Sequence, residues 1–280
     1  MYYTFRYVCY ALSTIAVIDM PNPKRTHSMK IAILNQKGGV GKTTVSVNLA
    51  YGLAQAKKRT LLIDLDPQAH ATVIYCADIP RDRTVKEIFE SRSADLGELI
   101  TPAAVLGKPV DNLFIVPSNI HLAVTTERMI SQHYREKRLH AQLEKLGGDY
   151  DYIVLDCPPN LGVITVNAIY TADWILIPTT YGRYSLDGIA DLFTSIEEIR
   201  EGQRGCWILR NALDSRTRAT NEYIEKQLEN VRPYVLKTII RKSEAINQAQ
   251  ISGEPVLTFD SKGHGAEDFR ALTKEVLRHG

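Results

Sequence analysis

A glycine-rich segment that joins an expected strand to an expected helix constrains this chain more than any other feature. The segment reads Gln36-Lys37-Gly38-Gly39-Val40-Gly41-Lys42-Thr43-Thr44, and it lies between an apolar run at 30–34 and an amphipathic stretch at 42–57. Glycines allow successive backbone N–H groups to point at phosphate oxygens, and the helix N-terminus adds partial positive charge. Lys42 is then expected to reach the β- and γ-phosphates of a nucleotide, and the Thr43 hydroxyl to take one Mg²⁺ position.

The same segment carries a second lysine that a simple phosphate site does not require. The common pattern GxxxxGK[ST] would place glycine at position 36, where this chain has Gln36, and Lys37 stands five residues before Lys42. One lysine suffices for the bound phosphates. Lys37 is therefore either solvated or reaches phosphates bound in a facing subunit, as an arginine finger does in trans.

Carboxylates follow two further apolar runs, at the points where the expected strands end. The run at 60–65 contains Asp64 and continues into Asp66, and the run at 151–156 ends in Asp156. Two carboxylates spaced two residues apart at a strand end lie on the same side, where they can hold an Mg²⁺ water and orient an attacking water. The apolar run before Asp156 has the form of a Walker B motif, whose acid lies at the Mg²⁺.

Short apolar runs alternate with amphipathic segments of helical period from Met29 onward. The runs cover 30–34, 60–65, 112–117, 151–156, 173–178, 206–210 and 235–240, and the helical segments include 42–57, 120–146, 185–202 and 217–230. The runs lack in–out alternation, as expected of strands buried on both faces of a parallel sheet. The pattern predicts an α/β fold with a doubly wound, mostly parallel sheet flanked by helices, and a ligand site at the carboxyl ends of its strands.

The first part of the chain differs from the remainder. Residues 1–28 combine a short apolar stretch with two prolines and a basic PKRTHS run. This composition is a poor match to a signal peptide, and the stretch is shorter than the ~20 apolar residues of a membrane helix. We expect residues 1–28 to be a loose N-terminal extension or a start-site artefact, and residues 29–280 to form a single domain.

Composition excludes several classes of protein. The 280 residues are 44% hydrophobic and 24% charged, with a net charge of +2, so the chain is neither wholly disordered nor basic enough throughout to advertise a nucleic-acid partner. Its four cysteines, Cys9, Cys76, Cys157 and Cys206, form no CxxC pair. Their spacing favours free thiols in a reducing cytoplasm over a disulfide framework or a zinc site.

These motifs together resemble the ParA/Soj branch of the deviant Walker A ATPases, the partition family that also includes MinD. The likeness runs from Met29 almost to the C-terminus. The motifs that carry it are KGGVGKTT (37–44), LLIDLDPQ (61–68), Val116-Pro117-Ser118-Asn119, DYDYIVLDCPPNLG (149–162), the strand from Ala172 to Pro178, and Gly253-Glu254-Pro255-Val256. The resemblance implies a P-loop NTPase fold of the deviant Walker A type, the cofactors ATP and Mg²⁺, and a role in plasmid or chromosome partition.

The resemblance also assigns roles to individual residues. It implies that Lys37 is the signature lysine, which crosses an ATP-sandwich dimer to the partner's nucleotide, and that Asp66 positions the hydrolytic water. Lys42 and Thr43 carry over as phosphate and Mg²⁺ contacts. The nucleotide-binding residues are then Lys37, Gly38, Gly39, Val40, Gly41, Lys42, Thr43, Thr44 and Asn211.

Asp64 and Asp156 would belong to the Mg²⁺ shell through water, and Asn211 would lie on the adenine side. The chain departs from the family pattern in two places. It has Ala69-His70 where the family often has Gly-Asn, and Ile239-Ile240-Arg241 where the family often has Ile-Pro-Arg. The second departure affects the expected contact with the base.

The segment from 204 to 242 is a candidate polyanion surface. It holds nine Lys and Arg against four Asp and Glu, although the whole chain carries only +2. Such a patch either is a solvated face or neutralises phosphates without reading bases. The resemblance favours the second, because ATP-bound dimers of the family coat DNA nonspecifically. The best candidates for DNA contacts are Arg216, Arg218, Arg241 and Lys242.

The resemblance thus implies a partition ATPase in the cytoplasm, associated with the nucleoid. ATP and Mg²⁺ would close a homodimer, the dimer would bind DNA, and a ParB-like activator would stimulate an otherwise slow hydrolysis to ADP and phosphate. The alternative is a MinD-like ATPase that positions cargo by cycling on membranes. MinD-type chains end in an amphipathic membrane helix, whereas the helical pattern at 269–278 here has no basic–apolar extension. Iron–sulfur reductases on the same scaffold share cysteines between subunits, and Cys157 and Cys206 do not match that pattern.

Overall fold

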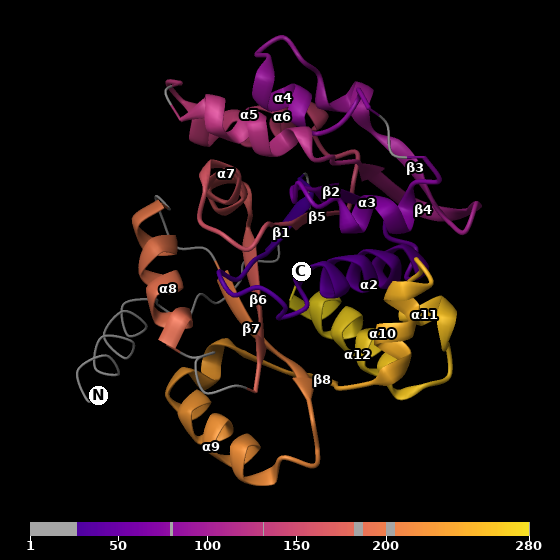
Figure 1. Cartoon of the computed structure of the whole chain (residues 1–280), viewed down its shortest axis with the longest axis vertical. Coiled ribbons are helices and arrows are strands. Elements are labelled where there is room, and N and C mark those ends of the chain that lie inside the picture. Colours follow the sequence, from indigo (N-terminus) through magenta and orange to yellow (C-terminus); the bar gives the residue numbers. More distant parts are fainter. Residues whose placement is uncertain (1–26, 79–80, 131, 182–186, 200–204, 280) are drawn as a thin grey trace.

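An eight-stranded sheet organises the chain, with helices on both of its faces (Figure 1). The computed structural model describes residues 27–78, 81–130, 132–181, 187–199 and 205–279. The strands are β1 (Met29–Ile33), β2 (Thr60–Asp64), β3 (Thr101–Val105), β4 (Lys108–Val116), β5 (Tyr152–Asp156), β6 (Trp174–Thr180), β7 (Gly205–Leu213) and β8 (Val235–Arg241). Their order is β3-β4-β2-β5-β1-β6-β7-β8, and every neighbouring pair is parallel except β3 with β4. The predicted fold class is confirmed.

The helices divide into two groups, each of which covers one face of the sheet with its own hydrophobic core. The first group is α2 (Lys42–Gln55), α3 (His70–Tyr75), α10 (Glu244–Ile251), α11 (Val256–Phe259) and α12 (His264–His279). The second is α4 (Lys86–Glu90), α5 (His121–Met129), α6 (Arg138–Leu146), α7 (Val163–Thr171), α8 (Asp187–Ile199) and α9 (Arg218–Leu228). This arrangement is the doubly wound topology that alternating strands and helices predict.

The central strands place their last residues at one level of the sheet. Every residue of β2 and of β5 is buried, as expected for strands covered on both faces. Asp156 at the end of β5 lies opposite Asp64 of β2 on one side and Ile33 of β1 on the other. The loops that follow β1, β2 and β5 therefore start side by side.

Two elements differ from the sequence-based prediction. The helical segment expected at 120–146 is two helices, α5 and α6, with a short 3₁₀ turn at Arg135–Lys137 between them, and Tyr134 before this turn has a φ of 57°. β3 is not among the predicted strands. It pairs antiparallel with β4 across a tight turn in which Leu106 and Gly107 have φ values of 48° and 75°. Both features depend on turns with residues at positive φ, which hydrophobic periodicity does not predict.

Some expectations fall outside the described residues. The extension at 1–28 is described only for its last two residues, and Cys9 lies in the part that is not described. The helix expected at 185–202 is described as α8. The three described cysteines, Cys76, Cys157 and Cys206, form no disulfide with one another.

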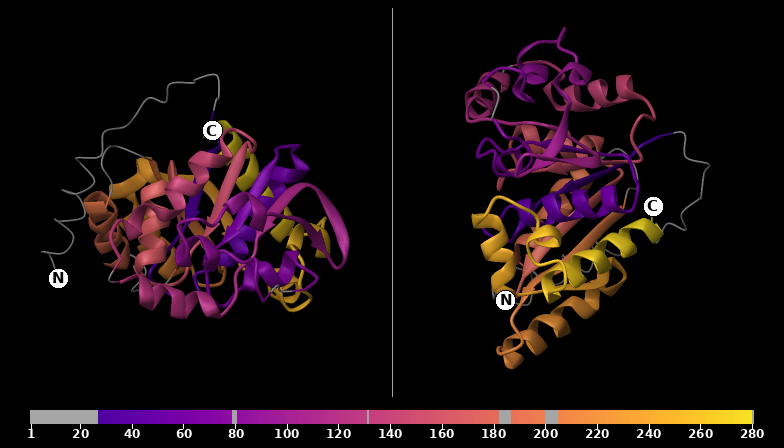
Figure 2. Two further views of the ribbon diagram at one scale, coloured as in Figure 1. Left: turned by 90° about the horizontal axis from the view of Figure 1, so that it is seen from above. Right: turned by 90° about the vertical axis from the view of Figure 1, so that its right-hand side faces the viewer.

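The C-terminal helix packs into the domain rather than projecting from it. Phe269, Leu272 and Val276 of α12 are almost wholly buried, and α12 packs against α2 (Figure 2). Gly52 of α2 provides the close approach, because a Cβ atom there would collide with the side chain of Thr273. None of the helices within the described ranges is long and apolar enough to cross a membrane.

The C-terminal end of α2 contains a left-handed residue that is not glycine. The N–H of Lys57 donates to the Ala54 carbonyl at 2.9 Å and that of Lys58 to the Leu53 carbonyl at 3.1 Å, the bonding pattern of a Schellman motif. Lys57 has a φ of 60°. A residue with a Cβ atom in this conformation costs about 1 kcal/mol relative to glycine.

We expect Lys57→Gly to raise the free energy of unfolding by about 1 kcal/mol, because glycine adopts this conformation without strain. The measurement is the thermal unfolding midpoint, with Lys57→Ala as the matched control that removes the charge but keeps the Cβ atom. A midpoint for Lys57→Gly no higher than that of Lys57→Ala would contradict the strained cap.

Candidate nucleotide-binding site

The glycine-rich loop leaves the end of β1 and leads directly into α2. Gly39 and Gly41 have φ values of 73° and 87°, in the left-handed region that glycine adopts without strain. A Cβ atom at Gly38 or Gly39 would meet nothing within 4 Å, so this backbone faces open space. A phosphate group can therefore approach the N–H groups of the loop closely.

Asn35 fixes the start of this loop. Its Nδ2 donates to the Pro178 carbonyl at 2.9 Å, and its Oδ1 accepts the N–H of Lys37 at 2.9 Å. Asn35 is buried and Pro178 belongs to β6, so one side chain ties the loop to the neighbouring strand. Sequence analysis missed this residue, although a polar side chain between a buried strand and the loop is a usable signal.

Lys42 opens α2 and turns back across the loop. Its Nζ donates to the Lys37 carbonyl at 3.2 Å, and the residue is only 7% exposed. Burial lowers the pKa of Lys42, while the carboxylates of Asp156 and Asp66 act in the opposite direction. The ammonium group therefore lies inside the concave side of the loop, where a bound phosphate would meet it.

Asp156, at the end of β5, lies behind the loop. Ser46 of α2 donates from Oγ to its Oδ1 at 2.8 Å, whereas its Oδ2 is buried without a hydrogen-bond partner among the described residues. Burial, and then repulsion from Asp64, raises the pKa of Asp156 to about 8. A buried, unpartnered carboxylate oxygen near the Thr43 hydroxyl fits a hard divalent cation that takes oxygen ligands. Thr43 and Asp156 are the residues that would hold Mg²⁺.

Asp64 uses both of its carboxylate oxygens within the protein. Its Oδ1 accepts the N–H of Asp66 at 3.1 Å, and its Oδ2 accepts the N–H and the hydroxyl of Thr72 at 2.9 and 2.7 Å. Burial raises the pKa of Asp64 to about 6, and the Thr72 hydrogen bonds oppose that shift. The place of Asp64 in a water-linked Mg²⁺ shell stays a prediction, since its oxygens already have protein donors.

A cavity of about 750 Å³ extends from the loop toward the ends of β7 and β8. Asp66, Lys42 and Thr43 line its phosphate-loop end, so the structure brings the predicted catalytic acid and the phosphate contacts into one space. Its wall also contains apolar side chains, those of Val73, Ile74, Ile240, Ile246 and Ile251. Cavities of roughly 300–1,000 Å³ with an apolar wall and a few polar groups are typical of small-molecule sites.

Two amide side chains border the cavity. Asn211 of β7 donates from Nδ2 to the Val40 carbonyl at 2.7 Å, so it braces the loop, and its predicted place on the adenine side stays a prediction. Gln250 of α10 donates from Nε2 to the hydroxyl of Thr44, and both residues line the cavity. Sequence analysis missed Gln250, because α10 carries no local motif and is far from the loop in sequence.

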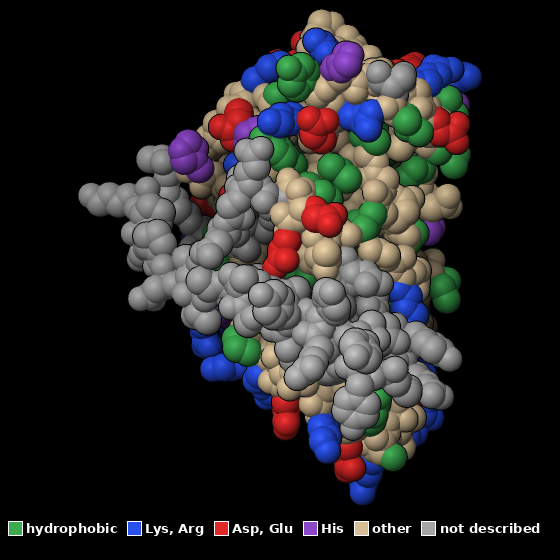
Figure 3. Space-filling view, turned by 90° about the vertical axis from the view of Figure 1, so that its left-hand side faces the viewer, with side chains coloured by type: hydrophobic (Ala, Val, Ile, Leu, Met, Phe, Trp, Pro, Cys, Tyr) green, Lys and Arg blue, Asp and Glu red, His purple; other side chains and the backbone are tan. Residues whose placement is uncertain are grey.

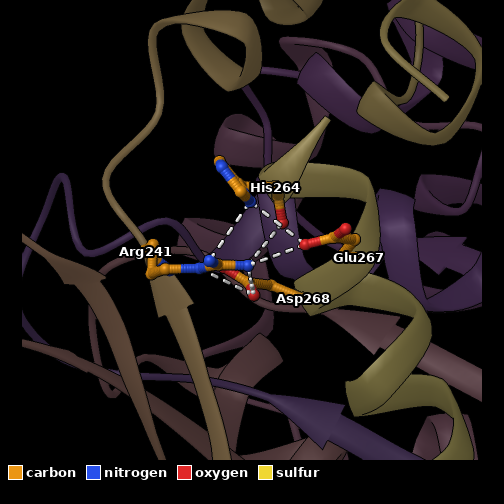
Figure 4. A network of polar contacts seen from close by, with 4 residues as sticks. All are labelled: Arg241, His264, Glu267 and Asp268. Carbon is orange, nitrogen blue, oxygen red and sulfur yellow. Dashed lines mark hydrogen bonds and ion pairs between the residues drawn. The ribbon is translucent and has the colours of Figure 1, made fainter. Parts of the chain in front are cut away.

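Arg241, one of the four predicted DNA contacts, is held by acidic side chains at the rim of this cavity (Figure 4). Its guanidinium donates to the Asp268 carboxylate at 2.6 to 3.0 Å and to Glu267 at 3.2 Å. The His264 carbonyl accepts a further bond at 3.3 Å. Arg241 therefore anchors the end of β8 to the first turns of α12.

Arg216 and Lys242 converge on one carboxylate, that of Asp214. The two nitrogen–oxygen distances are 2.7 and 3.5 Å, and the bonds from Arg216 hold the pKa of Asp214 well below its usual range. Arg218 is exposed at the first residue of α9. The structure thus gathers the candidate DNA contacts at the carboxyl ends of β7 and β8, but acids neutralise part of their charge.

Other basic residues of the 204–242 segment add less positive charge to the candidate DNA surface than their number suggests. Arg210 is 5% exposed and forms an ion pair with Glu225 at 3.0 Å, and Arg232 pairs with the same acid. Arg204 lies outside the described residues. On the face shown in Figure 3, positive side chains lie mainly toward the two ends, with acidic ones among them.

Comparisons with known proteins agree with this geometry. A family model described as an AAA domain matches residues 28–213. The chain is 37% identical to the sporulation initiation inhibitor protein Soj of Bacillus subtilis, over 89% of this chain and 98% of that protein. It is 34% identical to the chromosome partitioning protein ParA of Myxococcus xanthus, over 89% of this chain and 87% of that protein.

Two solved structures extend the likeness to the fold. Cobyrinic acid a,c-diamide synthase of Mycobacterium smegmatis, with a bound ATP analogue and magnesium, is 26% identical, with a TM-score of 0.74 over 90% of this chain and 95% of that chain. The cell division ATPase MinD of Pyrococcus furiosus is 20% identical and shares the fold, with a TM-score of 0.72 over 90% of this chain and 100% of that chain. With its phosphate loop, its two lysines and its acids at the strand ends, the chain belongs to the ParA/Soj family of P-loop ATPases.

Proposed function

We propose that this protein is a partition ATPase that binds ATP and Mg²⁺ in the cavity beside the glycine-rich loop and dimerises in the ATP state. The proposal rests on the different exposure of the two lysines in the loop. Lys42 is nearly buried and bonded across its own loop, whereas the side chain of Lys37 is exposed. One subunit needs only the first for its own phosphates, and the exposed position of Lys37 fits a contact with a nucleotide held by a facing subunit.

Hydrolysis in this proposal depends on residues that converge on the phosphate end of the cavity. The backbone N–H groups of the loop and Lys42 bind the phosphates, and Thr43 with Asp156 holds Mg²⁺. The bound Mg²⁺ supplies neutralisation of charge on the transferring phosphoryl group. Asp66 lies in the cavity wall, where its carboxylate orients the attacking water. The products are ADP and phosphate.

We further propose that the ATP-bound dimer binds DNA without sequence preference in the nucleoid, and that a ParB-like protein stimulates its turnover. Exposed Arg218 and the basic groups around Asp214 support a phosphate-contacting surface at the ends of β7 and β8. Two relatives are named chromosome partitioning proteins, which supports DNA as the cargo. The MinD-like alternative has less support, because the apolar side of α12 is buried against α2.

Lys37→Ala should leave ATP binding by the monomer largely intact, while dimerisation is lost and hydrolysis falls by about 1,000-fold, as on loss of a trans-acting cation. The measurements are equilibrium binding of a fluorescent ATP analogue, sedimentation velocity with ATP, and phosphate release. Lys108→Ala, which removes an exposed lysine from the first position of β4, is the control and should behave as wild type. Normal turnover by Lys37→Ala would refute the trans role.

Asp66→Ala should bind ATP but lose at least about 100-fold in turnover, because the water is no longer oriented. The trapped ATP-bound dimer should persist on DNA long after the wild-type dimer has dissociated. Dissociation from immobilised DNA after an ATP pulse measures this persistence. Failure of the Asp66→Ala protein to bind ATP would mean that Asp66 does not act on the water.

Sedimentation with a nonspecific DNA duplex tests the function as a whole. We expect binding with ATP and not with ADP, a steep decrease with salt, and no binding to anionic liposomes. Arg218→Ala should lower the slope of log affinity against log salt by about one, whereas Arg128→Ala, on α5 at the other end of the sheet, should not. ATP-dependent liposome binding without DNA binding would favour the MinD-like alternative.

A further inference from the structure

A buried hydrogen-bonded chain runs from the end of β4 to the loop that carries Asp66. It starts at the backbone N–H of Ser118, which donates to the Thr72 hydroxyl at 2.8 Å. That hydroxyl donates in turn to Oδ2 of Asp64 at 2.7 Å. Oδ1 of the same carboxylate accepts the N–H of Asp66 at 3.1 Å. Ser118, Thr72 and Asp64 are all 0% exposed, so water does not compete for these bonds.

Thr72 is the link that joins the two sides of this chain. Its hydroxyl accepts a hydrogen bond from the Ser118 N–H and donates its own hydrogen to Asp64, so one side chain bridges the two. Its own N–H also donates to Asp64, which places the carboxylate at the N-terminal turn of α3. A carboxylate in that position satisfies an N–H group that the helix itself leaves unpaired.

The Asp66 loop is fixed at few other points. Oδ1 of Asp66 accepts the N–H of Gln68 at 2.9 Å, and its carbonyl accepts the N–H of Ala69 at 2.9 Å, which closes a local turn. Leu65 bonds back to the Asp156 carbonyl. The local turn sets the shape of the loop, but the Asp64 carboxylate sets where the loop sits relative to β2. The orientation of that carboxylate depends on Thr72.

We propose that Thr72 is a positioning residue for Asp66, which holds the Asp64 carboxylate so that the Asp66 loop stays in register with the phosphate loop. The inference rests on the proposed hydrolytic role of Asp66. It adds that Thr72 holds Asp66 in the position that this role requires. Asp64 acts here through the Asp66 backbone. Ser118 connects this series of hydrogen bonds to the end of β4, and β4 pairs with β2 in the sheet.

The test compares Thr72→Val with Thr72→Ser in the full-length protein. Valine keeps the shape of threonine but removes the hydroxyl, and serine restores the hydroxyl without the methyl group. We expect Thr72→Val to lower kcat about tenfold, in the range for loss of a residue that orients a catalytic group, with ATP affinity within about twofold of wild type. Thr72→Ser should recover most of kcat. The Mg²⁺ concentration for half-maximal turnover should stay unchanged.

Thr84→Val is the matched control. Thr84 is also 0% exposed, and its hydroxyl has no hydrogen-bond partner within the described part of the chain. It precedes Val85, whose N–H bonds to the Pro117 carbonyl, so the control lies close to the same part of the sheet. The Thr84→Val protein should keep the wild-type kcat, because it loses a buried hydroxyl but no link to Asp64.

Hydrogen–deuterium exchange of the protein without nucleotide provides a readout that does not require turnover. The backbone amides of residues 65, 66, 68 and 69 should exchange faster in Thr72→Val than in wild type, Thr72→Ser or Thr84→Val, while the amides of β2 should be unchanged. Wild-type exchange and kcat in a folded Thr72→Val protein would overturn the inference. So would failure of Thr72→Ser to recover kcat, or a shift in the Mg²⁺ requirement. A wild-type protein that hydrolyses no ATP would instead refute the proposed function, and the exchange data would still decide the role of Thr72.

Discussion

Burial of parallel strands on both faces is the constraint on which the remaining structure depends. β2 and β5 are covered on both sides, so polar chemistry is confined to their carboxyl ends, where Asp64 and Asp156 lie opposite each other. β1 lies between β5 and β6, and the loop that follows it opens into the crevice at that edge. The register of β1, β5 and β2 thus places the phosphate loop, the acids and the cavity at the same edge of the sheet.

The site buries ionisable groups of both kinds, one lysine and two carboxyl groups. Lys42 is nearly buried, and Asp64 and Asp156 are wholly buried close together. Burial works against ionisation of all three groups, and it shifts the lysine and the carboxyls in opposite directions. A bound cation and a bound polyphosphate would each supply the missing counter-charge. The protein therefore holds an electrostatic imbalance that a nucleotide with its metal can relieve.

Sequence patterns predicted the parts of the structure that local rules govern. The seven parallel strands, the glycine-rich turn before α2 and the acids after β2 and β5 all follow from apolar runs and residue types at fixed offsets. The edge strand β3 and the break between α5 and α6 did not, because turn geometry at Leu106-Gly107 and Tyr134 decides them. Asn35, Thr72 and Gln250 were missed for a different reason. Each acts through a partner that is distant in sequence, and a single sequence does not reveal such pairs.

The contact between α2 and α12 joins the beginning of the domain to its end. Gly52 lies in the helix that follows the phosphate loop, and Thr273 lies in the last helix described. During synthesis on the ribosome, α2 emerges early, whereas α12, which packs on it, emerges after the other described helices. The core on this side of the phosphate loop can therefore be completed only after α12 has been made. A chain that stops before α12 would expose part of α2, so the order of synthesis itself delays a finished site.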